Sequence, residues 1–356
     1  MNKLDDAQNL AKCDQHQMTQ SIADLPFQIE QGWQEALSVK LPKNHSHISS
    51  IIVCGMGGSN LASELARAVF GREIKVPFVL VRGYDLPVFA DKNSLIIISS
   101  YSGGTDEPVS CLKQATLRKL KVLCLAGGGK VIAMAKANKL PYYQINKKYN
   151  LSGQPRYGVG SQLGALLALL KSAGVIKLSA GEMTRAVESL EVLGGLFDTD
   201  RATTQNPAKC HASWLSGGLP ILVGAEFLSA NGHIIANQIN ESAKNFAVPF
   251  VIPELNHHLM EGLLLPSAVT SRIRFVFFNS SLYHSENKKR FAITQQVLRR
   301  QQIKYMEYTI NGSSRLEAAL EILLFGSWLS FYLTVINEQN PTDIKWVDYF
   351  KAELKK

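Results

Sequence analysis

Residues 48–60 read ISSIIVCGMGGSN, an apolar run of mostly β-branched residues followed by a glycine-rich stretch. We predict a buried strand over Ile48–Cys54, because a short continuous apolar run bounded by glycines is typical of a strand that is covered on both faces. A helical pattern over Asn60–Phe70 follows, and the glycines between the two let the backbone turn tightly. The segment therefore predicts one strand–loop–helix unit of an α/β protein.

The same unit recurs along both halves of the chain. Further strand patterns lie at Val76–Val81, Ser94–Ser99, Lys121–Leu125, Pro141–Ile145, Leu219–Val223, Phe250–Ile252, Ile273–Phe278 and Ile303–Tyr308. Continuous apolar strands that alternate with helices indicate a parallel sheet covered by helices on both faces. We predict two α/β domains of the doubly wound, flavodoxin-like kind. They span residues 1–175, which include an N-terminal helical extension, and residues 176–356.

The composition of the 356 residues is that of an ordinary globular protein, with 46% hydrophobic and 19% charged residues. The net charge is +9, which can indicate nucleic acid, an anionic membrane surface or an anionic small substrate as partner. Lys and Arg are dispersed, and the densest cluster, at 288–290, is typical of a solvated helix face. The sequence shows no nucleic-acid recognition motif, so we expect no nucleic-acid partner.

The five cysteines include no CxxC pair, and we find no signal peptide, which together favour a reducing cytoplasm. The apolar stretch Leu163–Leu170 is too short to span a membrane, so we expect no membrane segment. The adjacent histidines at 257 and 258 have no third ligand at a recognisable spacing, so we expect no metal. No nucleotide-binding fingerprint is present, and we expect no cofactor.

Two loops at the carboxyl ends of predicted strands suit a phosphate group. Gly55–Ser59 leads into a helix whose free N–H groups and positive dipole end attract anions. The second loop, SYSGGT at 100–105, carries the hydroxyls of Ser100, Ser102 and Thr105. Since parallel α/β folds bind ligands beyond the carboxyl ends of their strands, we predict a neutral hydroxyl cup for phosphate. The alternative is that Thr105 merely caps the following helix.

Acid–base groups stand close together in the second half. Glu241 lies in NESAKN (240–245), and His257 follows in PELNHH (253–258), across one short apolar strand. A Glu of raised pKa can move a carbon-bound proton, and a His can shuttle a proton near neutral pH. We predict that the two side chains converge on one site. The alternatives are an ion pair of Glu241 with Lys244 and a purely structural His257.

These motifs together resemble those of the bifunctional phosphoglucose/phosphomannose isomerases, a branch of the sugar isomerase (SIS) superfamily. The matching segments are MTQSIADLPFQ (18–28), GMGGSN (55–60), SYSGGTDE (100–107), PRYGVG (155–160), NESAKN (240–245), PELNHH (253–258) and NPTDIKWVDYFKAEL (340–354). The resemblance implies two SIS domains and reversible conversion of glucose 6-phosphate and mannose 6-phosphate to fructose 6-phosphate. It further implies a homodimer with the active site at the subunit interface.

The resemblance also implies roles for individual residues. Arg156 would stabilise the enediolate, Glu241 would move the proton between C1 and C2, and His257 of the partner subunit would assist ring opening. Lys351, in a terminal helix that returns to the site, is implicated in proton transfer at the ring. Thr342 would leave room for rotation about C2–C3. The phosphate-binding residues would be Gly58, Ser59, Ser100, Ser102 and Thr105.

The chain departs from the family pattern at two positions. Gly104 stands where the family loop has Asn, which removes an amide beside the phosphate cup. Asp343 stands where a proline is common. Both changes concern specificity more than chemistry, and the sequence does not tell whether His257 or His258 faces the site.

Three other functions compete with the isomerase. A regulatory SIS module would keep the serine cup but would not need Glu241. A glucosamine 6-phosphate-forming isomerase would carry a glutaminase domain with an N-terminal cysteine, whereas this sequence starts Met1-Asn2-Lys3. A nucleic-acid binder would need a recognition motif and steep salt dependence.

Overall fold

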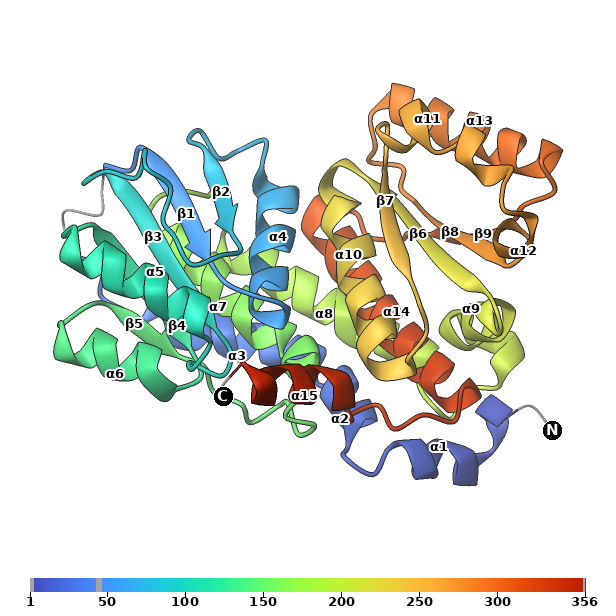
Figure 1. Cartoon of the computed structure of the whole chain (residues 1–356), viewed down its shortest axis with the longest axis horizontal. Coiled ribbons are helices and arrows are strands. Elements are labelled where there is room, and N and C mark those ends of the chain that lie inside the picture. Colours follow the sequence, from blue (N-terminus) through green and yellow to red (C-terminus); the bar gives the residue numbers. More distant parts are fainter. Residues whose placement is uncertain (1–2, 43–46, 355) are drawn as a thin grey trace. The chain divides into compact units, whose positions relative to one another are not determined.

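The computed structural model describes residues 3–42, 47–354 and 356, and it divides into two compact units. One unit is Ala23–Ser189, and the other combines Met1–Ile22 with Leu190–Lys356 (Figure 1). The first 22 residues thus pack with the C-terminal half, whereas the sequence analysis assigned them to the N-terminal domain. The predicted boundary between the two domains, at residue 175, stays a prediction.

The unit Ala23–Ser189 contains a parallel sheet of five strands in the order β2-β1-β3-β4-β5. This is the flavodoxin-like order, so the predicted fold class is confirmed for this half. All five strands lie where the sequence predicts them: β1 Ser50–Cys54, β2 Phe78–Val81, β3 Ser94–Ser100, β4 Lys121–Ala126 and β5 Tyr142–Gln144. Strands β1, β3 and β4 are buried along their whole length, as continuous apolar runs require.

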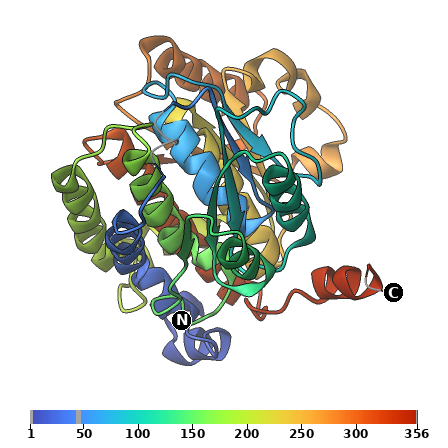
Figure 2. The same cartoon turned by 90° about the vertical axis from the view of Figure 1, so that its left-hand side faces the viewer.

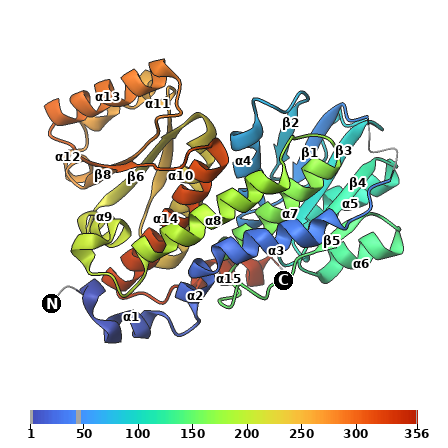
Figure 3. The same cartoon turned by 180° about the vertical axis from the view of Figure 1, so that it is seen from behind.

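Helices cover both faces of this sheet. They are α3 Leu25–Leu37, α4 Gly58–Phe70, α5 Asp106–Leu117, α6 Gly129–Ala137, the short η3 Pro155–Tyr157, α7 Val159–Ser172 and α8 Ala180–Phe197, which runs on into the other unit. α5 and α6 share one apolar cluster with the sheet. α3 lies against α7 (Figure 3). Their backbones touch, because a Cβ on Gly164 would stand 2.0 Å from the carbonyl oxygen of Ile29.

The other unit repeats the design with one strand fewer. Its parallel sheet has the order β7-β6-β8-β9, from β6 Leu219–Ala225, β7 Val248–Ile252, β8 Ile273–Asn279 and β9 Lys304–Thr309. The first strand again lies inside the sheet, with the second on one side and the third on the other. All four strands were predicted from the sequence, and the fold class is confirmed here too.

The helices of this unit are more varied than the sequence indicates. They are η1 Lys3–Asp5, α1 Ala7–Cys13, α2 Met18–Ala23, η4 Thr203–Gln205, α9 Pro207–Leu215, η5 Glu226–Leu228, α10 Ser229–Gln238, the π-helix η6 Ile239–Ala243, α11 Leu255–His258, η7 Glu261–Leu263, α12 Ser267–Thr270, α13 Ser285–Arg300, α14 Arg315–Ile336 and α15 Lys345–Glu353. Helix α10 ends at Gln238, and a π-helical turn follows it directly.

Helix α14 corrects one expectation. Among the described residues it is long and apolar enough to cross a membrane, with 22 residues and a mean hydropathy of 1.7. The sequence was expected to hold no apolar stretch long enough to span a membrane, and only Leu163–Leu170 was considered as a candidate. The apolar window of α14 is 94% buried, and the helix packs against α9 and α10. Its burial identifies it as the core helix of its unit.

Candidate functional site

The two predicted phosphate loops flank the topological switch point of the sheet in Ala23–Ser189. β1 and β3 are neighbours, and the chain leaves them toward opposite sides of the sheet, to β2 and β4. Loop 55–57 follows β1 and leads into α4, whereas loop 101–105 follows β3 and leads into α5. Ligands of doubly wound sheets bind at this position. The sheet order therefore brings the two loops together, as the sequence predicts.

Three hydroxyls of the second loop converge in the structure. The hydroxyl of Ser100 lies 3.4 Å from that of Thr105, and the hydroxyl of Ser102 lies 3.3 Å from the same oxygen. The Gly103 N–H donates to the Ser100 hydroxyl at 3.0 Å, and the Gly104 N–H donates to the Ser102 hydroxyl at 3.3 Å. The result is a neutral cluster of hydroxyls and amides that can donate hydrogen bonds to an anion.

The alternative role for Thr105 does not hold. Thr105 occupies the N-cap position of α5, with φ −65° and ψ 130°, but its side chain makes no capping hydrogen bond. The hydroxyl turns toward Ser100 and Ser102 instead. The first turn of α5 consequently keeps free N–H groups at the same place as the hydroxyls, which suits an anion.

Ser59 joins the two loops. Its hydroxyl accepts the N–H of Tyr101 at 2.7 Å, and its carbonyl accepts the hydroxyl of Ser99 at 2.6 Å. The Tyr101 ring is buried, and its phenol accepts a hydrogen bond from Asn150 at 2.6 Å. Burial raises the pKa of the Tyr101 phenol, so the phenol stays neutral. These contacts hold the hydroxyl cluster against the start of α4.

Gly58 brings Arg156 to the same place. A Cβ on Gly58 would stand 3.1 Å from the carbonyl carbon of Pro155 and 3.3 Å from the nitrogen of Arg156, so a larger residue would require a small displacement here. The Arg156 side chain is 1% exposed, and its Nη1 donates to Oε1 of Gln154 at 2.9 Å. A buried guanidinium thus lies on the segment that packs directly against the start of α4. The structure brings Gly58, Ser59, Ser100, Ser102, Thr105 and Arg156 into one region.

Glu241 lies in the π-helix η6 of the other unit. π-helical turns are rare and are frequent at functional sites. Lys244 ends this turn with φ +52°, and its ammonium donates to the backbone carbonyls of Glu241 and Asp343, both at 2.5 Å. One lysine thereby fastens the turn that carries Glu241 to the segment that contains Thr342. The sequence analysis considered Lys244 only as an ion-pair partner for Glu241 and missed this bridge.

Glu241 and His257 do not converge within one chain, which corrects the expectation from their spacing. The π-helix precedes β7 and is tied to its start, because the Asn240 side chain bonds the carbonyl and N–H of Ala247 at 2.9 and 3.0 Å. His257 lies in α11, which follows the other end of β7. The strand Val248–Ile252, which is roughly 16 Å long at about 3.3 Å per residue, lies between the two segments in the chain.

The two adjacent histidines differ in their surroundings. The ring of His258 packs against Phe250, with centroids 6.0 Å apart. The His257 side chain is exposed, on a short helix that Asn256 anchors to α13 through a 2.7 Å hydrogen bond to Thr294. Both histidines are exposed, so the ring contact of His258 with Phe250 is what distinguishes the two.

Lys351 lies on α15, which buries none of its residues (Figure 2). Thr342 lies just before this helix, where its hydroxyl and N–H bond Oδ1 of Asn340 at 2.8 and 3.0 Å. The structure thus places Thr342 beside the Glu241 turn through the Lys244 bridge.

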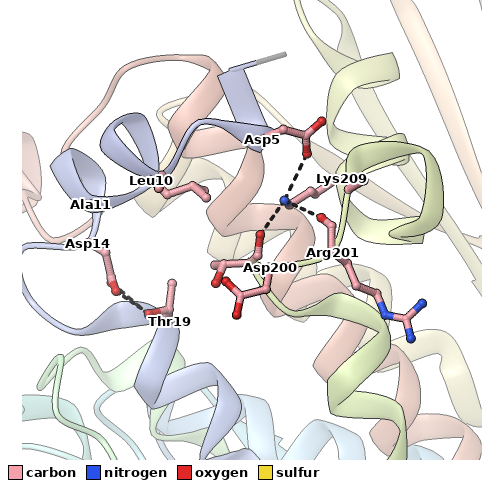
Figure 4. A pocket seen from close by; sticks show the side chains of 11 residues that line it. Asp5, Leu10, Ala11, Asp14, Thr19, Asp200, Arg201 and Lys209 are labelled. Carbon is pink, nitrogen blue, oxygen red and sulfur yellow. Dashed lines mark hydrogen bonds and ion pairs between the residues drawn. The ribbon is translucent and has the colours of Figure 1, made fainter. Parts of the chain in front are cut away.

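A cavity of about 680 Å³ is lined by none of these residues (Figure 4). It opens between the N-terminal helices η1, α1 and α2 on one side and α9 on the other. Lys209 lines it, with a 1% exposed side chain whose ammonium donates to the carbonyls of Thr199 and Arg201 at 2.8 and 2.7 Å and to Asp5 at 3.3 Å. This contact attaches Asp5 to the C-terminal half, and the sequence gave no sign of it because 204 residues separate the partners.

Comparison with known proteins supports the same family. Residues 204–354 match the model of the bacterial phospho-glucose isomerase C-terminal SIS domain. The chain is 27% identical over 341 residues to the bifunctional phosphoglucose/phosphomannose isomerase of Caldicellulosiruptor bescii, which covers 95% of this chain and 98% of the relative. It is 28% identical over 317 residues to the protein of the same name from Aquifex aeolicus, covering 89% and 93%.

A solved structure extends the likeness to the fold. A hypothetical protein from Thermus thermophilus superposes with a TM-score of 0.71 at 16% identity, covering 98% of this chain and 92% of that one. These findings confirm the resemblance that the sequence motifs indicate.

Proposed function

We propose that the chain is a sugar-phosphate isomerase that interconverts glucose 6-phosphate and mannose 6-phosphate with fructose 6-phosphate through an enediolate. Relatives named bifunctional phosphoglucose/phosphomannose isomerase cover nearly the whole chain. The observation that carries the proposal is the hydroxyl cluster of Ser100, Ser102 and Thr105 at the switch point, with Gly58 packed against Arg156. This arrangement suits a phosphate on one side and a developing negative charge on the other.

The phosphate would accept hydrogen bonds from the hydroxyls and from the N–H groups at the starts of α4 and α5. Neutral donors and helix dipoles hold a dianion without a permanent countercharge. The residues that we propose for this role are Gly58, Ser59, Ser100, Ser102 and Thr105. Gly104 leaves open space beside them, since no atom lies within 4 Å of a Cβ built there.

Glu241 would move the proton between C1 and C2, and Arg156 would stabilise the enediolate oxygen. The Lys244 bridge supports this role of Glu241, because it fixes the backbone of the turn that carries the carboxylate. The bridge also holds the segment of Thr342, for which we propose the role of leaving room at C2–C3. An internal proton transfer of this kind consumes neither a metal ion nor a nucleotide.

We further propose that the active unit is a homodimer with its site at the interface. Glu241 and His257 lie beyond opposite ends of β7, so the two can serve one sugar only if they come from different copies of the chain. The exposed His257 would then assist ring opening in the partner's site, and Lys351 on the unburied α15 would act at the ring. We place this activity in the cytoplasm, without nucleic-acid or membrane partners.

An assay of both products tests the proposal. Purified protein is given fructose 6-phosphate in the presence of a chelator, and glucose 6-phosphate and mannose 6-phosphate are quantified separately. The proposal predicts both products from the parent chain and at least a ~100-fold loss in Glu241→Gln, since a general base contributes about 10²–10⁴. Stabilisation of both proteins by fructose 6-phosphate without turnover in either would instead identify a regulatory sugar-phosphate binder.

A further inference from the structure

One buried amide joins the second phosphate loop to the segment that carries Arg156. Asn150 is 3% exposed, and its Nδ2 donates to the phenol of Tyr101 at 2.6 Å and to the backbone carbonyl of Gln154 at 2.9 Å. Its Oδ1 accepts the hydroxyl of Ser152 at 2.8 Å. Since a carbonyl oxygen can only accept a hydrogen bond, these contacts fix which way the amide points. Asn150 therefore ties the loop of the hydroxyl cluster to the residues just before Arg156.

The backbone packs closely around this amide. A Cβ on Gly158 would stand 2.4 Å from the Tyr101 ring and 2.9 Å from Nδ2 of Asn150, so the residue after the η3 turn touches both groups. The backbone N–H of Tyr101 in turn donates to the hydroxyl of Ser59 at 2.7 Å. Because close-packed groups resist displacement, the segment of Arg156 keeps a fixed position relative to the hydroxyl cluster.

The side chain of Gln154 holds the guanidinium itself. Gln154 occupies the N-cap position of η3, but its side chain makes no capping hydrogen bond. Its Oε1 accepts Nη1 of the buried Arg156 at 2.9 Å instead. An amide carries no net charge, so this bond orients the guanidinium and leaves its positive charge in place. A carboxylate at the same position would also orient the guanidinium, but it would offset the charge.

We infer that Gln154 is a positioning residue that aims the undiminished charge of Arg156 at the reacting carbons, and that Asn150 sets the place of this charge relative to the bound phosphate. The inference rests on the proposed isomerase function and deepens it. A charge lowers the barrier most when it already stands where negative charge develops. The phosphate and the enediolate belong to one sugar, so the distance between their two binding groups must be fixed as well.

Two substitutions of Gln154 separate this role from simple packing. Gln154→Ala removes the bond that orients Arg156, and kcat for fructose 6-phosphate should fall about ten-fold. Gln154→Glu keeps the shape and the bond but offsets the charge, and kcat should fall about 100-fold. The KM should change less than about two-fold in both, because the hydroxyl cluster is intact. A purely structural role predicts the opposite order, since Glu nearly matches the shape of Gln whereas Ala leaves a cavity.

Gln144→Glu is the matched control for the added charge. Gln144 ends the edge strand β5 and is exposed, so the same substitution there should leave kcat and KM at the parent values. Thermal unfolding of every variant is measured alongside the kinetics. The Tm of Gln154→Glu should equal or exceed that of Gln154→Ala, because the new carboxylate pairs with Arg156. The lower kcat of Gln154→Glu then cannot come from a less stable fold.

Tyr101→Phe tests the link through Asn150. The phenol oxygen is lost while the ring stays, and kcat/KM should fall about five-fold, because the amide loses its bond to the phosphate loop. Parent-like kinetics in Tyr101→Phe would overturn the role of Asn150. A kcat in Gln154→Glu that equals or exceeds that in Gln154→Ala would overturn the role of Gln154 and leave the isomerase standing. Absence of turnover in the parent chain would overturn the proposed function, and this inference with it.

Discussion

Glu241 and His257 are 16 positions apart in sequence but lie beyond opposite ends of the strand β7. The π-helix that holds Glu241 is tied to the start of β7 through Asn240, and the short helix with His257 follows its end. Within one chain the two side chains therefore lie on segments at opposite ends of β7. This separation is the structural reason for proposing a site that is built from two copies.

Removal of one hydroxyl from the phosphate cluster should weaken substrate binding. In Thr105→Val the shared hydroxyl is lost while the shape of the side chain is kept, so Ser100 and Ser102 lose their common neighbour. We expect the KM for fructose 6-phosphate to rise about ten-fold with a smaller change in kcat, because a hydrogen bond to a charged group is lost in ground state and transition state alike. Steady-state kinetics measures this.

A matched variant in the same helix provides the control for Thr105. In Thr116→Val the lost hydroxyl bonds only the carbonyl of Leu112, at 2.8 Å, and lies away from the cluster. Its KM should equal that of the parent. Equal KM values for both variants would remove Thr105 from the phosphate site.

A methyl group on Gly58 should displace the start of α4. The new carbon would contact Pro155 and Arg156 at 3.1 and 3.3 Å, and because the nearest atoms are mostly backbone, α4 or η3 must shift. We expect kcat/KM to fall about ten-fold or more, since small displacements of a positioned group are costly in catalysis. Gly104→Ala is the matched control, because nothing lies within 4 Å of the added carbon. Parent-like kinetics in Gly58→Ala would contradict a close approach that matters for the site.

The contact between Asp5 and Lys209 should make stability depend on pH. Burial alone would raise the pKa of Asp5. Hydrogen bonds from Thr203 and Lys209 outweigh this effect, so the pKa of Asp5 lies below its usual value. Asp5 therefore contributes stability above its unfolded pKa of about 3.9, and this contribution is lost as pH falls through the lower folded pKa. Thermal unfolding between about pH 3 and 6 should show a steeper fall of Tm on acidification in the parent than in Asp5→Asn.

Asp200→Asn controls for the general loss of a carboxylate. Asp200 lines the same cavity but is exposed. Its Tm should follow the pH dependence of the parent. Parallel curves for the parent and Asp5→Asn would show that the Asp5 contact does not stabilise the fold.

Much of the fold could be predicted from the sequence because buried parallel strands leave continuous apolar runs. All nine strands of the described residues were predicted, with ends that differ by at most two residues. The hydroxyl cluster could be predicted for the same reason, since both loops directly follow such strands. The placement of Glu241 and His257 at opposite ends of β7 could not be predicted. Their separation along the sequence does not tell at which end of a strand each residue lies.

Contacts between distant segments left no pattern in the sequence. The attachment of the N-terminal helices to the C-terminal half includes Asp5 with the buried Lys209, on a helix that was not predicted, and Lys3 with Glu338. The role of Lys244 depends on a left-handed backbone at the end of a π-helix, which no periodicity reveals. Helix α14 was judged by uninterrupted apolar runs, although its burial tolerates Glu321 inside it.

Mixed dimers of two inactive variants test the central claim most directly. Glu241→Gln and His257→Ala are purified separately with different tags, then unfolded and refolded together. If each site takes Glu241 from one copy and His257 from the other, half of the random dimers carry one intact site of two. The mixture should then regain about a quarter of the parent activity, although each variant alone is nearly inactive. A mixture as inactive as its components would contradict a site that two copies share.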